Sequence, residues 1–310
     1  MRRWGDDPAA PHVRRPSVAG LFYPASGQAL RALVDELLAA AAGLPDVRAD
    51  SAADRGLPVG ILVPHAGLAY SGIVAAAGWS RLQEPPREPT GEPLTVVLLG
   101  TNHGAGWLDG VAAWDSGAWS TPSGPAGVDA SLAESVVGLG RPFLVDRDAH
   151  DGEHSIEVQL PLLLAVVPTA LLVPLSVSAG RGARAIDAGA RLGSLLAARR
   201  TAGARIVLAI STDMAHYPPA AACESATDIL LPSILALDAA GLAGREDDLR
   251  GAGIRDLVCG MCGIDPAVLG LAALRAMGAT VGRVLGAATS ADAGGPPDRT
   301  VGYVAARFDA

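Results

Sequence analysis

The segment ALLVPLSVSAGRGARAIDAGARLGSLLAARRTAGARIVLAIS, residues 170–211, indicates the fold class by itself. It begins with the apolar run ALLVPLSV (170–177), continues with the amphipathic helix pattern ARAIDAGARLGSLLAARR (183–200), and ends with the apolar run RIVLAIS (205–211). Apolar runs without polar alternation are typical of strands that are buried on both faces. Such strands separated by helices favour an α/β fold, in which helices cover both faces of one sheet.

The same alternation continues on both sides of this segment. Further strands are predicted at VGILV (59–63), TVVLLG (95–100), 280–288 and 300–308, and helices at 30–41, 131–139, 155–167, 221–238 and 265–277. We therefore expect one three-layer α/β/α domain over residues 16–310 with a mainly parallel or mixed central sheet. The C-terminal TVGYVAARF is expected at an antiparallel edge, and residues 1–15 are expected to form a loosely held arm.

Composition excludes several classes of protein. All 24 basic residues of the 310-residue chain are arginine, so no Schiff-base or P-loop lysine is present. The net charge of −8 gives no basic field to attract nucleic acid or an anionic membrane. The N-terminus lacks the apolar core of a signal peptide, and prolines interrupt the apolar stretch 160–175. Three cysteines are too few for a disulfide framework, so we expect a cytoplasmic protein in a reducing compartment.

Three histidines follow predicted strands at their carboxyl ends. His65 follows GILVP, His103 follows VVLLGTN, and His216 follows VLAISTDMA. Loops at this edge of an open α/β sheet converge and bind ligands, so the pattern predicts a metal site or an acid/base site. The alternative is that each histidine is an ordinary loop residue. His154 begins the 155–167 helix, and we expect it beside the ligands rather than among them. Neighbouring Asp151 or Glu153 is expected to cap that helix.

The motif VCGMCG (258–263) carries Cys259 and Cys262 just before the predicted helix 265–277. A C-x-x-C pair is compatible with a redox disulfide, half of a zinc knuckle, or one metal ligand beside a bystander. The preceding GAGIRDLV is loop-like, unlike the strand before a thioredoxin motif, and no second C-x-x-C pair is present. One thiolate that joins two strand-end histidines is the simplest solution, and the positive end of the following helix is expected to favour that thiolate.

Seven motifs occur in an order that resembles the Memo family, known in bacteria as AmmeMemoRadiSam system protein B. They are AGLFYP (19–24), VPHAGLAYSG (63–72), LLGTNH (98–103), EHSIEVQLPLL (153–163), STDMAHY (211–217), CGIDP (262–266) and VGYVAARF (301–308). The resemblance spans nearly the whole chain beyond residue 15. It implies the fold of the catalytic subunits of class III extradiol ring-cleaving dioxygenases, which hold a non-haem Fe(II) ion. It also implies an association with radical-SAM and AMMECR-type proteins.

Carried over to matching positions, the resemblance implies that His65 and His103 bind the metal and that His216 is the acid/base residue. The C-G-x-x-P pattern selects Cys262 as the third ligand. It replaces the carboxylate of the dioxygenases, so copper(I), zinc or an electron-rich iron is favoured. Phe22 and Tyr70 are implied as aromatic walls of the cleft.

Our leading hypothesis is a mononuclear, iron- or copper-dependent, dioxygenase-like oxidoreductase, with zinc as a further candidate ion. His216 is expected to transfer protons with a pKa near neutrality, and Asp213 to orient His216, to contact the metal, or only to cap its loop. Cys259 is able to compete for the ion or to form a disulfide with Cys262.

Two other hypotheses have support in the sequence. The first is a non-catalytic module that binds a peptide or protein in the same cleft. The second is dinucleotide binding, because SAGRGARA (178–185) contains G-x-G-x-x-A between a strand and a helix. Hydrolase chemistry finds little support, because the chain has no G-x-S-x-G elbow.

Overall fold

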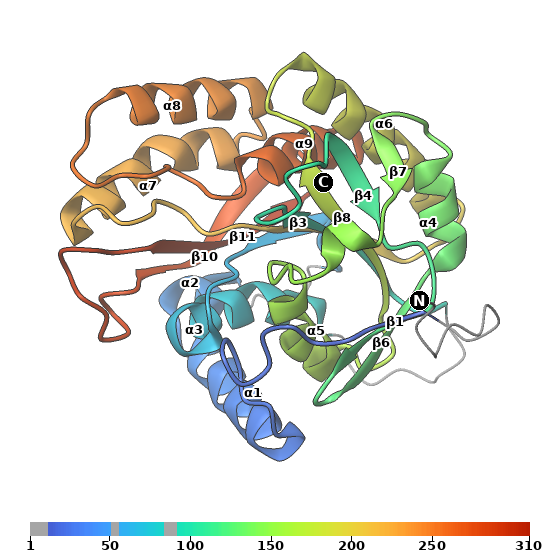
Figure 1. Cartoon of the computed structure of the whole chain (residues 1–310), viewed down its shortest axis with the longest axis horizontal. Coiled ribbons are helices and arrows are strands. Elements are labelled where there is room, and N and C mark those ends of the chain that lie inside the picture. The colour runs from blue at the N-terminus through green and yellow to red at the C-terminus, as the bar shows by residue number, and fades with distance from the viewer. Residues whose placement is uncertain (1–11, 51–55, 84–91) are drawn as a thin grey trace, which may run out of the picture.

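A computed structural model describes residues 12–50, 56–83 and 92–310. Within this part of the chain, eleven strands form one mixed sheet (Figure 1). Its order is β1 (Val13–Arg14), β5 (Ala118–Thr121), β6 (Gly124–Val128), β8 (Leu171–Ser178), β3 (Thr95–Thr101), β9 (Ile206–Ser211), β2 (Gly60–Val63), β11 (Gly302–Asp309), β10 (Val281–Thr289). β4 (Gly110–Ala113) pairs with β8 and with β7 (Phe143–Val145). The predicted α/β class with a mixed central sheet is confirmed.

Helices cover both faces of the sheet. Successive residues of a strand point to opposite faces, and in the central strands both sets are apolar, so each face needs a covering layer. In β3, Val96 and Leu98 join one buried cluster, while Val97 and Leu99 join another. The first face is covered by α1 (Gly27–Ala41), α2 (Pro45–Asp50), α3 (Leu68–Trp79) and α5 (Leu160–Val166) (Figure 1). The second is covered by α4 (Ala130–Val137), α6 (Ala183–Thr201), α7 (Ala220–Leu235), α8 (Ala239–Gly251) and α9 (Ile264–Ala276).

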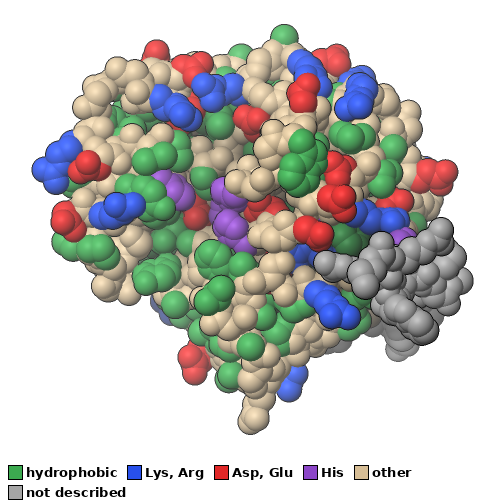
Figure 2. All heavy atoms as spheres, viewed as in Figure 1, with side chains coloured by type: hydrophobic (Ala, Val, Ile, Leu, Met, Phe, Trp, Pro, Cys, Tyr) green, Lys and Arg blue, Asp and Glu red, His purple; other side chains and the backbone are tan. Residues whose placement is uncertain are grey.

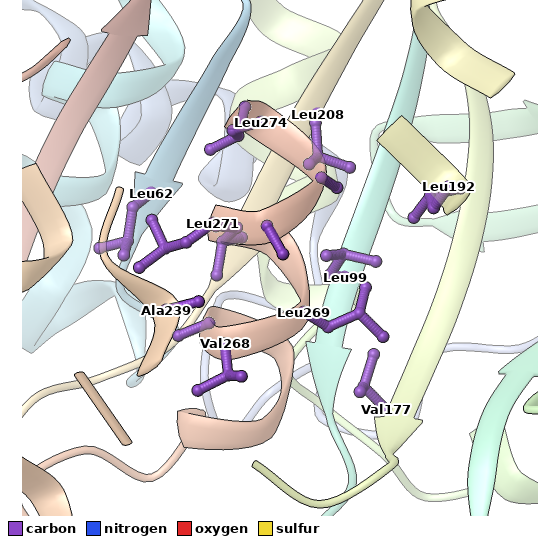
Figure 3. Close-up of a cluster of buried hydrophobic side chains, with 14 of the residues drawn as sticks. Leu62, Leu99, Val177, Leu192, Leu208, Ala239, Val268, Leu269, Leu271 and Leu274 are labelled. Carbon is purple, nitrogen blue, oxygen red and sulfur yellow. The ribbon is translucent and has the colours of Figure 1, made fainter. Parts of the chain in front are cut away.

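Helix α9 fixes the loop that carries the two site cysteines. Figure 3 shows Leu269 and Leu271 of α9 among Leu62, Leu99 and Leu208 from the strands. On its other side α9 lies directly against α6, where a Cβ at Gly189 would be 2.2 Å from the carbonyl oxygen of Leu269. A larger residue at this position would push α9 away from α6. The start of α9 is therefore held by close packing on two sides.

The C-terminal strand differs from the prediction in its place within the sheet. β11 is antiparallel to both of its neighbours, β2 and β10, as expected from its sequence. It lies inside the sheet, however, and β10 occupies the edge. The prediction that TVGYVAARF is an edge strand is thus wrong. A nearly continuous apolar strand is better buried between two partners than exposed at an edge.

The predicted arm, residues 1–15, ends earlier than expected. Residues 1–11 lie outside the described residues, but Val13–Arg14 pairs with β5 and only 3% of Arg14 is exposed. Arg14 donates hydrogen bonds to Glu157 Oε2 (2.6 Å) and to the carbonyl oxygen of Glu153. Residues 13 and 14 thus belong to the sheet, so the prediction of a loosely held arm is wrong for them.

Some elements deviate from or escape the sequence prediction. The single helix expected at 155–167 is a 3₁₀ turn, η3 (Glu157–Gln159), that leads into α5. The sequence patterns did not predict β1, β4, β5, β6, β7, α2, α3 and α8. In the described part of the chain, every helix is too short or too polar to cross a membrane.

Candidate metal centre

Three neighbouring parallel strands deliver the predicted histidines to one edge of the sheet. β9 lies between β3 and β2 and is parallel to both. His103 follows β3, His65 follows β2, and Asp213 and His216 follow β9. Because parallel strands end together, the loops that carry these residues meet in one place.

The cysteine loop is attached to the segment after β9. The N–H of His216 donates to the carbonyl oxygen of Cys259 (3.0 Å), and the N–H of Gly263 donates to Thr212 Oγ1 (2.9 Å). A Cβ at Gly263 would lie 2.5 Å from Thr212 Oγ1, so glycine permits this close approach. The attachment brings Cys262 to the strand-end histidines.

The predicted ligands come together in space. Cys262 Sγ lies 3.2 Å from His65 Nε2, and the rings of His65 and His103 are 5.3 Å apart, edge to face. One donor atom each of His65, His103 and Cys262 lies within 4.8 Å of the others. Two imidazoles and a sulfur at this separation are able to bind a single ion.

A buried chain of hydrogen bonds fixes the tautomer of His65. Trp79 Nε1 can only donate, so its 2.8 Å partner in Gln159 is the amide oxygen, and the amide nitrogen donates to Ser211 Oγ (2.9 Å). Ser211 Oγ in turn donates to the carbonyl oxygen of Ser155. The single hydroxyl proton of Ser211 is thus already used. In the 3.0 Å contact between Ser211 Oγ and His65 Nδ1, Nδ1 must therefore be the donor. The Nε2 lone pair of His65 therefore faces Cys262.

Glu153 does the same for His103. Its Oε1 accepts from His103 Nδ1 (3.0 Å) and from the N–H groups of His154 and Ser155, while Oε2 accepts from the N–H of His103 (2.7 Å). Burial alone would raise the pKa of Glu153, but these hydrogen bonds and the charge of His103 hold it well below its usual range. The carboxylate thus holds a proton on Nδ1, so in the neutral form of His103 the lone pair is on Nε2.

One oxygen of Asp213 is engaged with the loop that carries His65. Its Oδ1 accepts the N–H of His65 (2.6 Å) and the N–H of Ala66 (3.2 Å). Burial outweighs these hydrogen bonds and raises the pKa of Asp213 to about 7. The structure gives no hydrogen bond from Asp213 to His216, although donor atoms of Asp213, His216 and Cys262 lie within 4.8 Å of one another.

The protonation of His216 and Cys262 differs from expectation. Burial, together with the neighbouring His103 and His154, lowers the pKa of His216 to about 4, so the predicted pKa near neutrality is wrong. Burial and then the Asp213 carboxylate raise the pKa of Cys262 well above its usual value. The dipole of α9 does not offset these effects in the metal-free protein, because burial disfavours the charged thiolate.

The donors lie in a pocket of about 850 Å³. His154 stacks between Phe22 (ring centroids 4.7 Å apart) and His103 (4.6 Å), and Tyr70 also lines the pocket. Figure 2 shows histidines near the centre of this face, with hydrophobic side chains around them. The predicted substrate-binding residues Phe22 and Tyr70 and the predicted neighbour His154 are thus brought to the same pocket.

Residues 14–307 match the family model described as Memo-like protein. The chain belongs to the Memo family. It is 34% identical to a MEMO1 family protein of Methanopyrus kandleri over 95% of this chain and 98% of that one. A MEMO1 family protein of Aquifex aeolicus is 33% identical, over 96% and 99% of the two chains. A crystal structure of an uncharacterized Escherichia coli protein, JW3007, aligns with a TM-score of 0.48, 16% identity and 81% and 99% coverage.

Three residues of this Memo protein that shape the site were missed in the sequence. Glu153, Ser211 and Gln159 all support the two histidines from behind. Glu153 was read as a helix cap, and indeed it accepts the N–H of Ser155. Its position directly before His154, in a loop with two histidines, was the available signal. Nothing in the spacing of Ser211 or Gln159 marks them.

The glycine-rich loop of this Memo protein has acidic partners. The N–H of Gly180 donates to Asp265 Oδ2 (2.9 Å), and Arg181 and Arg184 pair with Asp247 and Asp109. A phosphate would have to displace a carboxylate from each of these groups, so the geometry does not favour a dinucleotide.

Proposed function

We propose that this Memo-family protein is a metal-dependent oxidoreductase of dioxygenase-like type. The observation that carries the proposal is a pair of tautomer locks: Ser211 holds Nδ1 of His65, whose Nε2 lies 3.2 Å from Cys262 Sγ, and Glu153 holds Nδ1 of His103, which offers a donor atom within 4.8 Å of the other two. A histidine that ligates a metal typically donates its other ring N–H to such a partner.

The donor set fits iron, copper or zinc. Two imidazoles and one thiolate form an N₂S set, which suits borderline and soft ions better than magnesium or calcium. His65, His103 and Cys262 would hold the ion, and a redox-active ion would supply the one-electron chemistry that O₂ requires. The raised pKa of the Cys262 thiol is consistent with a sulfur that needs a cation beside it to ionise.

His216 is placed to move a proton. Its Nε2 is buried without a hydrogen-bond partner among the described residues, and its ring lines the pocket. A substrate hydroxyl that reaches this pocket would find an open acceptor at Nε2. Asp213 would hold the His65 loop through its two accepted N–H bonds, and Phe22 and Tyr70 would limit the access of water.

The test is metal content after anaerobic purification. We expect about one ion of iron, copper or zinc per chain in the wild-type protein, and a loss of most of it in His65→Ala and Cys262→Ser. Cys259→Ser is the matched control, because it removes a buried thiol three residues away that lies outside the proposed ligand set. The proposal would be overturned if both ligand variants kept the wild-type metal content. If the metal content depends on these ligands, oxygen consumption that is lost when His216 is replaced would establish that the protein is an oxidoreductase.

A second function uses the same pocket as a binding site for a peptide or protein. The exposed side chains Leu21 (84%) and Tyr70 (51%) at its rim favour this alternative. Radical-SAM and AMMECR-type proteins are the partners that we expect on either hypothesis. A stable complex formed by metal-free protein, without metal-dependent oxygen consumption, would favour the binding module.

A further inference from the structure

One wall of the pocket carries an arginine whose charge is poorly balanced. Among the described lining residues, the charged side chains other than histidine and cysteine are Asp213 and Arg250. Asp213 is buried and its Oδ1 accepts two N–H bonds. Arg250, in the last turn of α8, is the permanent cation of the lining, and about half of its side chain is exposed.

The nearest carboxylate does not pair closely with Arg250. Its Nη1 lies 4.0 Å from Glu246 Oε1, and the described part of the chain offers it no hydrogen bond. Arg181 nearby differs, because it contacts Asp247 at 2.5 Å. Glu246 is fully buried, and burial raises its pKa to about 7, so near neutral pH its carboxyl balances only part of the charge.

A second arginine lies next to a lining residue of the pocket. The guanidinium carbon of Arg299 lies 4.1 Å from the ring centroid of Tyr217, which lines the pocket. Other lining residues, Leu21, Phe22 and Tyr70, present apolar surface. The lining therefore combines a cationic side chain, apolar side chains and the candidate metal donors.

We propose that this pocket takes an amphiphilic small molecule, whose apolar body lies against Phe22 and Tyr70 and whose single anionic group pairs with Arg250. Carboxylate, sulfonate and phosphate share the chemistry that a guanidinium recognises. The part of the molecule nearest the histidines would be the part that reacts, and only this last assignment rests on the proposed function. Arg250 would thus set specificity, and it would do so without touching the metal donors.

Two fluorescent probes with the same anilinonaphthalene body test the proposal. 8-Anilinonaphthalene-1-sulfonate carries an anionic group, and N-phenyl-1-naphthylamine lacks it. We expect Arg250→Gln to raise the Kd of the sulfonate about fivefold, as for a half-exposed ion pair, and to leave the Kd of the neutral probe unchanged. Arg250→Lys should restore part of the loss.

Two variants control for location and for general loss of charge. Arg245→Gln removes an exposed arginine of the same helix that donates to the carbonyl oxygen of Ile229, and it should change neither Kd. Tyr70→Ala should weaken both probes. The proposal is wrong if Arg250→Gln leaves the sulfonate unaffected or weakens both probes equally, or if Tyr70→Ala affects neither. Metal content is measured on the same samples, so a protein without metal that still prefers the anion would refute the proposed function and keep this inference.

Discussion

Two buried carboxylates near the pocket, Glu157 and Glu246, differ in how completely they are hydrogen-bonded. On the N-terminal side, Glu157 accepts hydrogen bonds at both oxygens, from Arg14 (2.6 Å), from the N–H groups of Ser17 and Val18, and from the hydroxyl of Tyr23 (2.6 Å). On the other side, Glu246 accepts the N–H of Gly260 at 3.2 Å, and its Oε2 has no hydrogen-bond partner among the residues that the structure describes. Both side chains are fully buried.

The difference shows which side is organised in advance. Arg14 also donates to the carbonyl oxygens of His150 and Glu153, so the ion pair with Glu157 holds the loop whose Glu153 orients His103. A satisfied buried network of this kind specifies one arrangement. The Glu246 side holds a charge that folding disfavours, next to the residues that we propose to contact the substrate. The Arg14–Glu157 network thus supports the loop next to the candidate metal ligands, whereas Arg250, which lines the pocket, has no close counter-charge among the described residues.

The largest expected effect is a loss of stability when the fully hydrogen-bonded Glu157 is changed. Glu157→Gln should lower the free energy of unfolding by about 3–5 kcal/mol, because it leaves the Arg14 guanidinium buried without a counter-charge. Urea denaturation measures this. Tyr23→Phe, which removes one hydrogen bond and no charge, should lower the free energy of unfolding by only about 1 kcal/mol. Equal losses in the two variants would show that the ion pair is not the centre of this network.

The next largest effect is expected on metal affinity, when the carboxylate that orients His103 is changed. Glu153→Gln should weaken zinc binding about 10- to 100-fold, because an amide cannot accept the N–H groups at both of its ends and His103 loses its fixed tautomer. Competition with a chromophoric chelator measures the affinity. Glu134→Gln, an exposed change on α4, should leave zinc affinity unchanged. Wild-type affinity in Glu153→Gln would mean that His103 needs no orienting carboxylate.

The elements that could be predicted are those whose signal is local. β2, β3, β8 and β9 are apolar runs, and His65, His103 and His216 follow such strands directly, so the edge where they meet was predictable from parallel topology. β6 was not predictable, because its sequence GPAGV is what a turn would also show. The position of β11 between β2 and β10 depends on distant pairing, which no local pattern encodes.

The supporting residues of the site were hidden for the same reason. Glu153 and Gln159 act only because the segment after His150 folds back against β3 and β9, and this requires the Arg14 ion pair from the other end of the sequence. The pKa of His216 was wrongly expected near neutrality, because burial by distant loops, not the sequence around it, determines the value.

The smallest expected effect is a gain in stability when the poorly paired Glu246 is changed. The folded-state pKa of Glu246, about 7, lies above its ordinary value of 4.5, so the folded protein binds the proton more tightly than the unfolded chain. The contribution of Glu246 to the free energy of unfolding therefore falls as pH rises from about 4.5 to about 7. Glu246→Gln, which removes the ionisation, should stabilise the protein by about 1–2 kcal/mol at pH 8 and by much less at pH 5.

Thermal unfolding at the two pH values, with Glu134→Gln as the exposed control, measures this difference. A gain that is equal at both pH values would show that the carboxyl of Glu246 does not titrate in this range. A loss at pH 8 would show that its charge is compensated, and the contrast between the two sides would disappear.

The location of β11 inside the sheet has a consequence for how the protein is made. The ribosome releases Gly302–Asp309 after every other described strand, yet this strand must enter beside β2, whose loop carries His65. A chain that lacks this strand exposes an unpaired edge at β2, beside the loop that carries His65. We therefore expect that deletion of residues 302–309 lowers the stability of the fold and, with it, the affinity of the proposed site for metal.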